Sequence, residues 1–545
     1  MKIEYAINKL RMSKFLISLF FVLISMSQVF AQEAKEILCR VIDIESKYPV
    51  SYATIKFADV QNGVIADEEG GFRLPADYKT LNKAIIISSI GFATLTINAG
   101  TLKDNTINDI YLKPRREELN EVVLKVKTKS TRNSISPETI IKNAIGRIAT
   151  NYPYYPHSYI SYYRDYQLIN NSYFNLNEAI MENFDAGFNT SKFKYKDNTS
   201  ALYSYQLNKN FNQDTLLLNS IYGESKLLDT HKNAKLGTNI QNELELLNLH
   251  NPIRNFNKNS FSFIYIFKDN FIDNHNFKLS KIVYIEDTPL YEIKINSRAE
   301  QNSRYKAEGN IYISKTNFAI HKLEYRVFEN SEYSSGRSKD NPFGNLNRSK
   351  GSTLFEINIE YKAAGNKMFL NYMTFNNRFI IKEPNPFKVE DFNFNASNES
   401  FYITFNKAID DTTIKRKSNF KLRYKDKKLI VTNIKLVEDK TVKIEVIDWS
   451  AGIANDVKVV SSGDFSYKLK KIKDVSGAEL NKASMLVGYQ FRELFTQEIF
   501  EQKQPVEDLI YVNKKKPLSY ANINKTTIDI KKYWINTPLK QTKDN

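Results

Sequence analysis

Short runs in which apolar and polar residues alternate recur along most of this chain, and they constrain its fold more than any other feature. In "SYATIKFADV", the residues Ala53, Ile55 and Phe57 fall on one side of an extended chain. Thr54 and Lys56 fall on the other side. A period of two is typical of half-buried β-strands. The 33 tyrosines and 35 phenylalanines also favour strands, because flat side chains fit a pleated sheet. The sequence therefore predicts a mainly β protein.

The first 31 residues have the pattern of a secretory signal peptide. Basic residues between positions 9 and 14 precede an apolar run at 15–24, and a small-residue cleavage site ends at Ala31. The apolar run is shorter than the ~20 residues that a membrane-spanning helix needs. We therefore expect cleavage after Ala31 and export of the mature chain.

The charge of the chain is strongly basic. The formal charge of +17 falls to +14 without residues 1–31, since these hold four basic groups and one acid. Export makes anionic envelope surfaces the expected partners of such a chain, and it argues against nucleic acid.

The single cysteine, Cys39, cannot form an intrachain disulfide. The three residues before it lack the small side chain expected next to a lipidated cysteine. We therefore expect Cys39 to be a small buried hydrophobe on a strand.

Between residues 37 and 114, short strands joined by polar turns leave no room for a helix and predict a small β-sandwich. Within it, "GVIADEEGGFRLP" (63–75) places three acids beside two glycines. A calcium loop needs acids at alternate positions, whereas Asp67, Glu68 and Glu69 are adjacent, and three carboxylates would repel a phosphate. Glycines supply the positive φ angles of a tight reversal. We interpret the stretch as a turn.

Four motifs in this region carry a resemblance to a known family. "RVIDIESKYPVSYATIKF", "GVIADEEGGFRL", "IIISSIGFATLTI" and "LNEVVLKV", within residues 36–126, resemble the carboxypeptidase regulatory-like domain of exported Bacteroidota proteins. Ala66 stands where that family usually has Thr, and Phe92 where it usually has Tyr. The resemblance implies a transthyretin-like sandwich of seven strands and an accessory module without catalytic activity.

A search for a peptidase site finds only one fragment. "HKLE", from His321 to Glu324, spells the H-x-x-E of zinc carboxypeptidases, but it lies in a strand-like run, where positions three apart face opposite sides. A catalytic zinc needs a third protein ligand, and no histidine follows His321. We therefore expect no catalytic residues, no metal and no cofactor. A glycan hydrolase or a metallopeptidase is the alternative.

After the sandwich, "SISPETIIKNAIGRIATNYP" predicts an amphipathic helix. Ser136 can cap it, Pro137 suits its first position, and an apolar stripe ends before Pro153. A tyrosine-rich stretch follows, which can stack on sugar rings or simply cover a sheet. Its candidate ligand-binding residues are Tyr152, Tyr154, Tyr155, Tyr159 and Tyr162.

Six further strand-like runs predict a broad, curved antiparallel meander. They are "FSFIYIFKD", "LYEIKINSR", "GNIYISK", "FAIHKLEYRV", "LFEINIEYKA" and "MFLNYMTFNNRFI". Together with the helix and "NEAIMENF", they resemble the large domain that follows the sandwich in many Bacteroidota envelope proteins. In outline they are also similar to the half-open barrels of lipoprotein carriers, which hold an acyl chain.

Residues 391–480 interrupt this meander. "ESFYITFNKAIDD" and the closing "IKDVSGAEL" resemble a bacterial immunoglobulin-like domain, with Asp474 and Gly477 in the closing turn. "VGYQFRELFTQEIF" then resumes the large domain as a strand or a helix, and its periodicity does not decide which.

These patterns predict six segments along the chain. They are a signal peptide (1–31), the carboxypeptidase regulatory-like β-sandwich (32–116), a linker (117–135), a large β-domain with an N-terminal helix (136–390), an Ig-like insertion (391–480) and the completion of the large domain (481–545).

The function that we expect is binding or assembly in the cell envelope, without catalysis. The protein is expected in the periplasm or at the outer membrane, with outer-membrane or other envelope proteins as partners. Binding of a carbohydrate or a lipid is the alternative.

Overall fold

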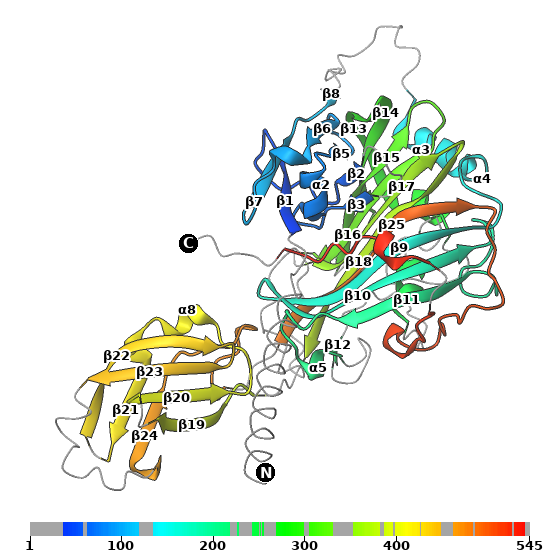
Figure 1. Cartoon of the computed structure of the whole chain (residues 1–545). Helices are drawn as coiled ribbons and strands as arrows, with labels where there is room; N and C mark the ends of the chain where they lie inside the picture. The colour runs from blue at the N-terminus through cyan, green and yellow to red at the C-terminus, as the bar shows by residue number, and fades with distance from the viewer. Residues whose placement is uncertain are drawn as a thin grey trace, which may run out of the picture. The chain divides into compact units, whose positions relative to one another are not determined.

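The structure is a computed structural model of the chain, shown in Figure 1. It describes residues 36–57, 63–118, 135–218, 226–227, 242–249, 251, 253–254, 269–298, 305–330, 353–381, 386–395, 398–425, 427–447, 462–482, 486–525 and 528–539. The chain divides into two units. The first joins Met1–Arg115 to Asn536–Asn545, and the second is Arg116–Ile535.

The first unit contains a seven-stranded β-sandwich. Its strands are β1 (Glu36–Asp43), β2 (Thr54–Phe57), β3 (Gly63–Ile65), β4 (Gly71–Pro75), β5 (Ala84–Ser88), β6 (Leu95–Asn98) and β7 (Ile107–Leu112). One sheet has the order β4-β1-β7 and the other β3-β2-β5-β6. The alternation of the sequence is confirmed in β2, where Ile55 and Phe57 are buried and Lys56 is exposed.

Two details of the sandwich bear on the sequence-based expectations. The expectation of no helix was wrong, because the five-residue helix α2 (Ala76–Thr80) follows β4 directly and Pro75 precedes its first turn.

The expectation for Cys39 is confirmed. Its thiol is free and fully buried on β1, and burial raises its pKa to about 12.

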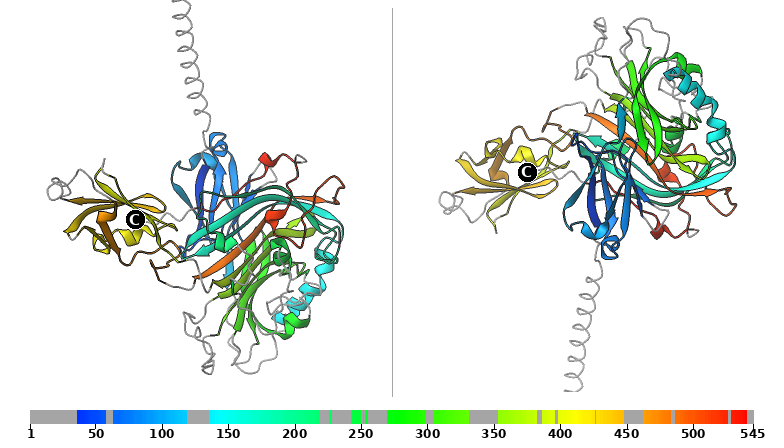
Figure 2. Two further views of the ribbon diagram at one scale, coloured as in Figure 1. Left: turned by 90° about the horizontal axis from the view of Figure 1, so that it is seen from below. Right: turned by 90° about the horizontal axis from the view of Figure 1, so that it is seen from above.

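The second unit is built on a twelve-stranded antiparallel sheet that forms a half-barrel (Figure 2). Its strands are β8 (Arg116–Glu118), β9 (His157–Ile169), β10 (Ser172–Asp185), β11 (Thr199–Leu207), β12 (Lys226–Leu227), β13 (His275–Ile285), β14 (Thr288–Ser297), β15 (Tyr305–Ser314), β16 (Ile320–Glu329), β17 (Thr353–Ala364), β18 (Lys367–Ile381) and β25 (Leu486–Glu501). The order is β11-β10-β9-β25-β18-β17-β16-β15-β14-β13-β8, and β12 pairs with β18. The run at 487–500, which the sequence left open, is therefore a strand, and it lies between β9 and β18.

Helices cover the apolar face of this sheet. Ser136 caps α3 (Pro137–Gly146) by accepting a hydrogen bond from the Thr139 amide at 3.2 Å. The predicted single helix is interrupted at Arg147, and the short helix α4 (Ile148–Asn151) continues the path. Apolar residues of α3 and of α6 (Glu243–Leu249) share one core with side chains from strands β9 to β18. Phe271 of the short helix α7 (Asp269–Asp273) belongs to the same core, whereas Leu217 of α5 (Thr215–Leu218) lies in a separate apolar cluster.

The opposite face of the sheet carries a polar row. The strand registers place Glu178, Arg164, Glu493, Thr374, Asn358 and Glu324 side by side across six strands. Tyr163 and Leu323, the sequence neighbours of two of them, belong to the apolar core, so the row lies on the other face. Cross-strand pairs of this kind are the stabilising contacts of a sheet face.

The interrupting region forms a further six-stranded sheet with the order β19-β20-β23-β22-β21-β24. Its strands are β19 (Val389–Asn395), β20 (Ser400–Phe405), β21 (Phe420–Tyr424), β22 (Lys427–Glu438), β23 (Thr441–Ile447) and β24 (Phe465–Leu469), with the helix α8 (Asp411–Ile414). They enclose a core of their own. In the closing turn, Asp474 accepts a hydrogen bond from the Ala478 amide at 2.8 Å, and Gly477 has a φ of +85°.

Several sequence-based predictions lie outside the described residues. They are the signal peptide, the motif at 119–126 and the strand expected at 261–268. Among the residues that are described, no helix is long and apolar enough to cross a membrane.

Candidate functional site

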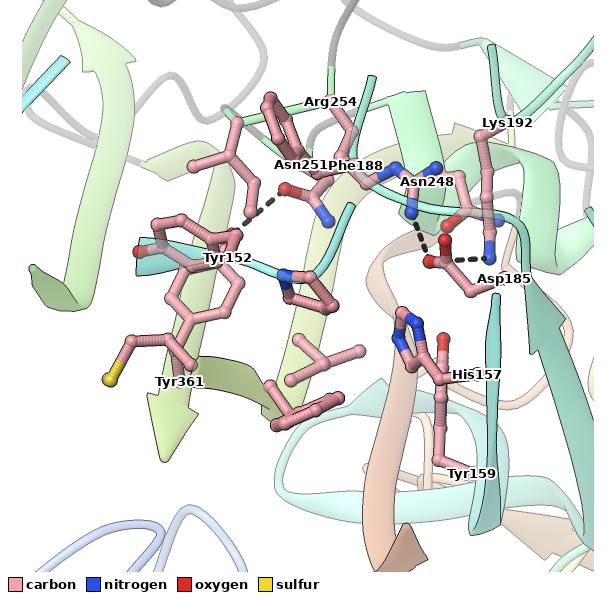
Figure 3. Close-up of a pocket in the computed structure, with 15 residues that line it drawn as sticks. Tyr152, His157, Tyr159, Asp185, Phe188, Lys192, Asn248, Asn251, Arg254 and Tyr361 are labelled. Atoms are coloured by element: carbon pink, nitrogen blue, oxygen red, sulfur yellow. Dashed lines mark hydrogen bonds and ion pairs between the residues drawn. The ribbon is translucent and has the colours of Figure 1, made fainter. Parts of the chain in front are cut away.

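The large β-domain contains a small cavity at one end of β9 and β10 (Figure 3). Its volume is about 40 Å³. Stretches far apart in the sequence line it, namely the start of β9, the end of β10 and its following loop, residues after α6, and the adjoining ends of β17 and β18. A space of this size holds roughly three water molecules, or the oxygen atoms of one small anionic group.

Three charged side chains meet at this cavity. The Asp185 carboxylate forms an ion pair with the Arg254 guanidinium, and the Lys192 ammonium lies 3.6 Å from the same carboxylate oxygen. All three side chains are buried, with exposed fractions of 8%, 6% and 9%. Burial raises the pKa of Asp185, but the charges of Arg254 and Lys192 outweigh it and hold the pKa well below its usual range.

The two cations are not equivalent. The Arg254 guanidinium donates hydrogen bonds to the carbonyl oxygens of Gly187 at 2.7 Å and Thr190 at 3.2 Å, which fixes the loop after β10. Burial lowers the pKa of Lys192 to about 8, although Asp185 opposes this change. At neutral pH the site therefore holds two cations against one carboxylate.

His157 stands beside this cluster, directly opposite Asp185 in the register of β9 and β10. Its Nδ1 lies 3.2 Å from the carbonyl oxygen of Tyr155. Burial lowers the pKa of His157 below its ordinary value, so the ring is neutral at pH 7. A neutral ring that donates from Nδ1 presents Nε2 as an acceptor.

The rest of the cavity wall is mostly apolar and aromatic. The wall residues of this kind include Tyr152, Phe188, Ile253, Tyr361, Met368 and Phe369. Asn251 accepts a hydrogen bond from the Tyr361 hydroxyl at 2.8 Å, which holds the two walls together. A few polar groups in a mainly apolar wall are typical of small-molecule sites.

The arrangement favours an anionic oxygen as ligand. Among the described residues, the buried Nε–H of Arg254 has no hydrogen-bond acceptor. An unsatisfied buried donor is costly, and a carboxylate or phosphate oxygen would satisfy it and balance the excess positive charge. The site is thus suited to binding an anionic group.

The structure separates the five candidate tyrosines. Tyr152 and Tyr159 are buried and line the cavity, and the Tyr152 hydroxyl donates to the carbonyl oxygen of Ile320 at 2.8 Å. Tyr162 is also buried and donates to Glu178 at 2.6 Å, on the opposite face of the sheet. Tyr154 is 53% exposed, and its ring packs edge-on against Phe188. Tyr155 is half-buried and donates to Glu501 at 2.6 Å.

Comparison with known families identifies the N-terminal unit. Residues 39–124 match the family model of the CarboxypepD_reg-like domain. The N-terminal sandwich is a CarboxypepD_reg-like domain. This agrees with its seven strands and with the four motifs of the sequence. No curated protein and no solved structure shows a significant match to the chain.

In the CarboxypepD_reg-like domain, the acidic stretch forms the turn between β3 and β4. The Asp67 carboxylate accepts hydrogen bonds from the amides of Glu69 at 3.0 Å and Gly71 at 2.6 Å. Gly70 has a φ of +72°, and a Cβ atom there would lie 2.5 Å from the carbonyl oxygen of Val41. The interpretation as a turn is confirmed, because the Asp67 carboxylate accepts hydrogen bonds from backbone amides of the turn itself.

The H-x-x-E fragment lies on β16, outside the CarboxypepD_reg-like domain. Glu324 forms a 2.7 Å ion pair with Lys322 and accepts a hydrogen bond from Asn310 at 3.2 Å. His321 is buried, and burial lowers its pKa to about 4. Within the described residues, no group of three or more His, Cys, Asp or Glu side chains could hold a metal ion.

Sequence reasoning did not find His157, Asp185, Lys192 or Arg254. Asp185 and Lys192 lie in or just after a polar strand, and Arg254 follows a short helix, so no local motif distinguishes them. The available signal was the position of His157 beside the tyrosine-rich stretch, which does line the cavity in part.

Proposed function

We propose that this chain is a non-catalytic binding protein of the cell envelope, and that its large β-domain binds a small amphipathic acid. The ligand places a carboxylate or phosphate group against Arg254 and Lys192 and an apolar portion against the aromatic wall. The observation that carries this proposal is the buried cluster of two cations on one carboxylate, with an Arg254 donor left unsatisfied.

The burial of the tyrosines supports this ligand class over a glycan. A space of about 40 Å³ accommodates only the charged group of either kind of ligand. Three of the five tyrosines that could stack on sugars are buried, so their ring faces already pack against protein. The apolar portion of the ligand is then expected to displace wall side chains or to extend toward solvent.

Calorimetric titration of the full chain tests the proposal with four probes. Decanoate and decyl phosphate carry both halves of the expected ligand, whereas decanol lacks the charge and inorganic phosphate lacks the chain. We expect decanoate and decyl phosphate to bind at least tenfold more tightly than decanol or inorganic phosphate. Absence of binding by both acids would contradict the proposal.

Substitutions at Lys192 and Arg254 test whether the ligand binds in this cavity. Lys192→Met and Arg254→Gln should each weaken decanoate or decyl phosphate at least tenfold, because a charge-assisted hydrogen bond is lost. Arg326→Gln is the matched control, since Arg326 pairs with Glu308 on the same sheet and does not line the cavity. Equal weakening in all three variants would place the ligand elsewhere.

The cellular part of the proposal is export to the periplasm and docking at the outer membrane. It is supported by the signal-like N-terminal sequence, by the basic charge and by the presence of a CarboxypepD_reg-like accessory domain. Crosslinking in intact cells, followed by identification of the attached proteins, is the test. Enrichment of outer-membrane proteins is expected, and recovery only from the soluble periplasm would contradict docking.

A further inference from the structure

A short segment from the end of the chain covers one side of the N-terminal sandwich. β3 and β4 are edge strands of their two sheets, and the turn at residues 66–70 joins them. Residues 536–539 belong to the same unit and run along this side. An uncovered edge strand exposes unpaired backbone groups and invites association, so the segment protects both sheets.

Asn536 connects the two edges with one side chain. Its Oδ1 accepts a hydrogen bond from the backbone N–H of Arg73 on β4 at 3.0 Å. Its Nδ2 donates to the carbonyl oxygen of Ile65 on β3 at 2.9 Å. Asn536 is only 3% exposed. An aspartate in this place would lack the donor, and a leucine would lack both groups, so the contact is selective for an amide of this length.

Arg73 binds the backbone of the next two residues. Its Nε donates to the carbonyl oxygen of Thr537 at 2.7 Å, and its Nη2 donates to that of Pro538 at 3.2 Å. Nη1 is held at 2.7 Å by Glu36 of β1, which orients the guanidinium. These contacts require an extended segment but do not depend on which side chains follow Asn536.

Leu539 provides the second anchor. It is 4% exposed although it lies six residues from the end of the chain. A Cβ atom at Gly71 would lie 3.0 Å from the Leu539 Cδ1, so the glycine leaves the space that this side chain fills. Burial of this side chain favours the docked segment, because it removes apolar surface from water.

We propose that this side of the sandwich is a recognition site for an extended Asn-x-x-Leu segment, and that the chain's own residues 536–539 occupy it as an intramolecular latch. The site combines backbone capture at a sheet edge with two side-chain pockets, as peptide-binding domains do. The same segment supplied by another molecule competes with the latch for the site. The inference is independent of the cavity in the large domain.

The experiment uses the full chain with a weakened latch. A fluorescein-labelled peptide with the sequence of residues 533–543, YWINTPLKQTK, is titrated against the Asn536→Ala/Leu539→Ala variant and against the wild-type chain, with fluorescence anisotropy as the readout. We expect the variant to bind the peptide at least tenfold more tightly, because the wild-type site is already filled. A peptide with Asp in place of Asn should bind the variant at least tenfold more weakly, since it cannot donate to Ile65.

A second measurement separates recognition from misfolding. The peptide should raise the Tm of the variant and leave that of the wild-type chain unchanged, because a ligand stabilises only a folded protein with a free site. If the double variant does not fold, Leu539→Ala alone retains Asn536 and is measured in the same way. A folded variant that neither binds the peptide nor gains thermal stability would overturn the proposal, and so would equal binding of the Asp peptide.

Discussion

Arg164 on β9 and Glu493 on β25 form an ion pair in which both side chains are almost fully buried, with exposed fractions of 1% and 0%. The two residues are 329 positions apart in the sequence and directly opposite in the sheet. The Arg164 guanidinium also lies over the ring of Phe495, 5.1 Å from its centroid. A shift of β25 by one residue would turn Glu493 to the apolar face, so the pair fixes the register of the strand that returns after the insertion.

Removing one partner of this pair should be strongly destabilising. We expect Glu493→Gln to lower the free energy of unfolding by about 3–5 kcal/mol, because the buried Arg164 guanidinium loses the carboxylate to which its Nε–H donates. Glu308→Gln is the matched control. It breaks the pair with Arg326 on the same sheet, whose side chains are 43% and 39% exposed, and should cost less than about 1 kcal/mol. Urea unfolding measures the loss of stability in both variants. A similar loss in Glu493→Gln and Glu308→Gln would contradict the expected difference between the buried and the exposed ion pair.

Lys192 should make stability depend on pH in the alkaline range. Its folded pKa is lowered to about 8, whereas the unfolded value is near 10.4. Between these values the unfolded chain holds a proton that the folded chain has released, so stability contributed by this group rises with pH. The difference in unfolding free energy between wild type and Lys192→Met should therefore increase by roughly 2–4 kcal/mol from pH 7.5 to 10.5. A difference that is flat or falls over this range would refute the environment assigned to Lys192.

The Asp67 turn should respond to mutation and not to calcium. Asp67→Ala removes the acceptor of two turn amides and should lower the stability of the sandwich by about 1–3 kcal/mol. Gly70→Ala should also destabilise it, because of the positive φ and the close Val41 carbonyl. Thermal unfolding in calcium and in EDTA should give the same Tm for the wild-type chain. A calcium-dependent rise that Asp67→Ala abolishes would restore the metal-loop interpretation.

Two tyrosines near the cavity should behave in opposite ways. Tyr152→Ala should lower the free energy of unfolding by about 3–5 kcal/mol. It removes a buried ring, and it also removes the hydroxyl that donates a hydrogen bond to the Ile320 carbonyl oxygen. Tyr154→Ala should lower the free energy of unfolding by less than about 1 kcal/mol, since about half of this side chain is exposed to solvent. If Tyr154 instead stacks on a sugar, its variant will lose binding on a glycan array while its Tm stays that of the wild type.

The purified protein should contain no stoichiometric zinc. His321 and Glu324 lie three apart on one strand, and Glu324 is already paired with Lys322. Elemental analysis by plasma mass spectrometry is the measurement. One zinc per chain that disappears in His321→Ala would support the metallopeptidase alternative.

Local pattern was enough to predict most strands and helix α3. Ile55 and Phe57 alternate with Lys56 because one face of their sheet is buried, and Ser136 with Pro137 marks the start of α3 through backbone capping. These signals act within a few residues, so a single sequence contains them. The break at Arg147 was missed because the apolar stripe continues into α4, where Ile148 packs against the same core.

The cavity could not be predicted in the same way. His157 and Asp185 become neighbours through the register of β9 and β10, and Arg254 reaches them from a separate stretch. The position of β25 is a similar case, since its partners β9 and β18 are set by topology and its own periodicity suits a helix or a strand. The tyrosine-rich stretch lies partly at the cavity, where its buried members Tyr152 and Tyr159 form part of the wall and do not present an exposed stacking surface.

The central place of β25 has a consequence for the biogenesis of this protein. Until residues 486–501 have emerged, β9 and β18 each keep one unpaired edge, and the two halves of the sheet cannot join. Pairings between distant segments form slowly, and open edges are prone to aggregation. The large domain can therefore complete its sheet only after residues 486–501 have been synthesised, and a chain truncated before this strand is expected to depend on chaperones or to be degraded.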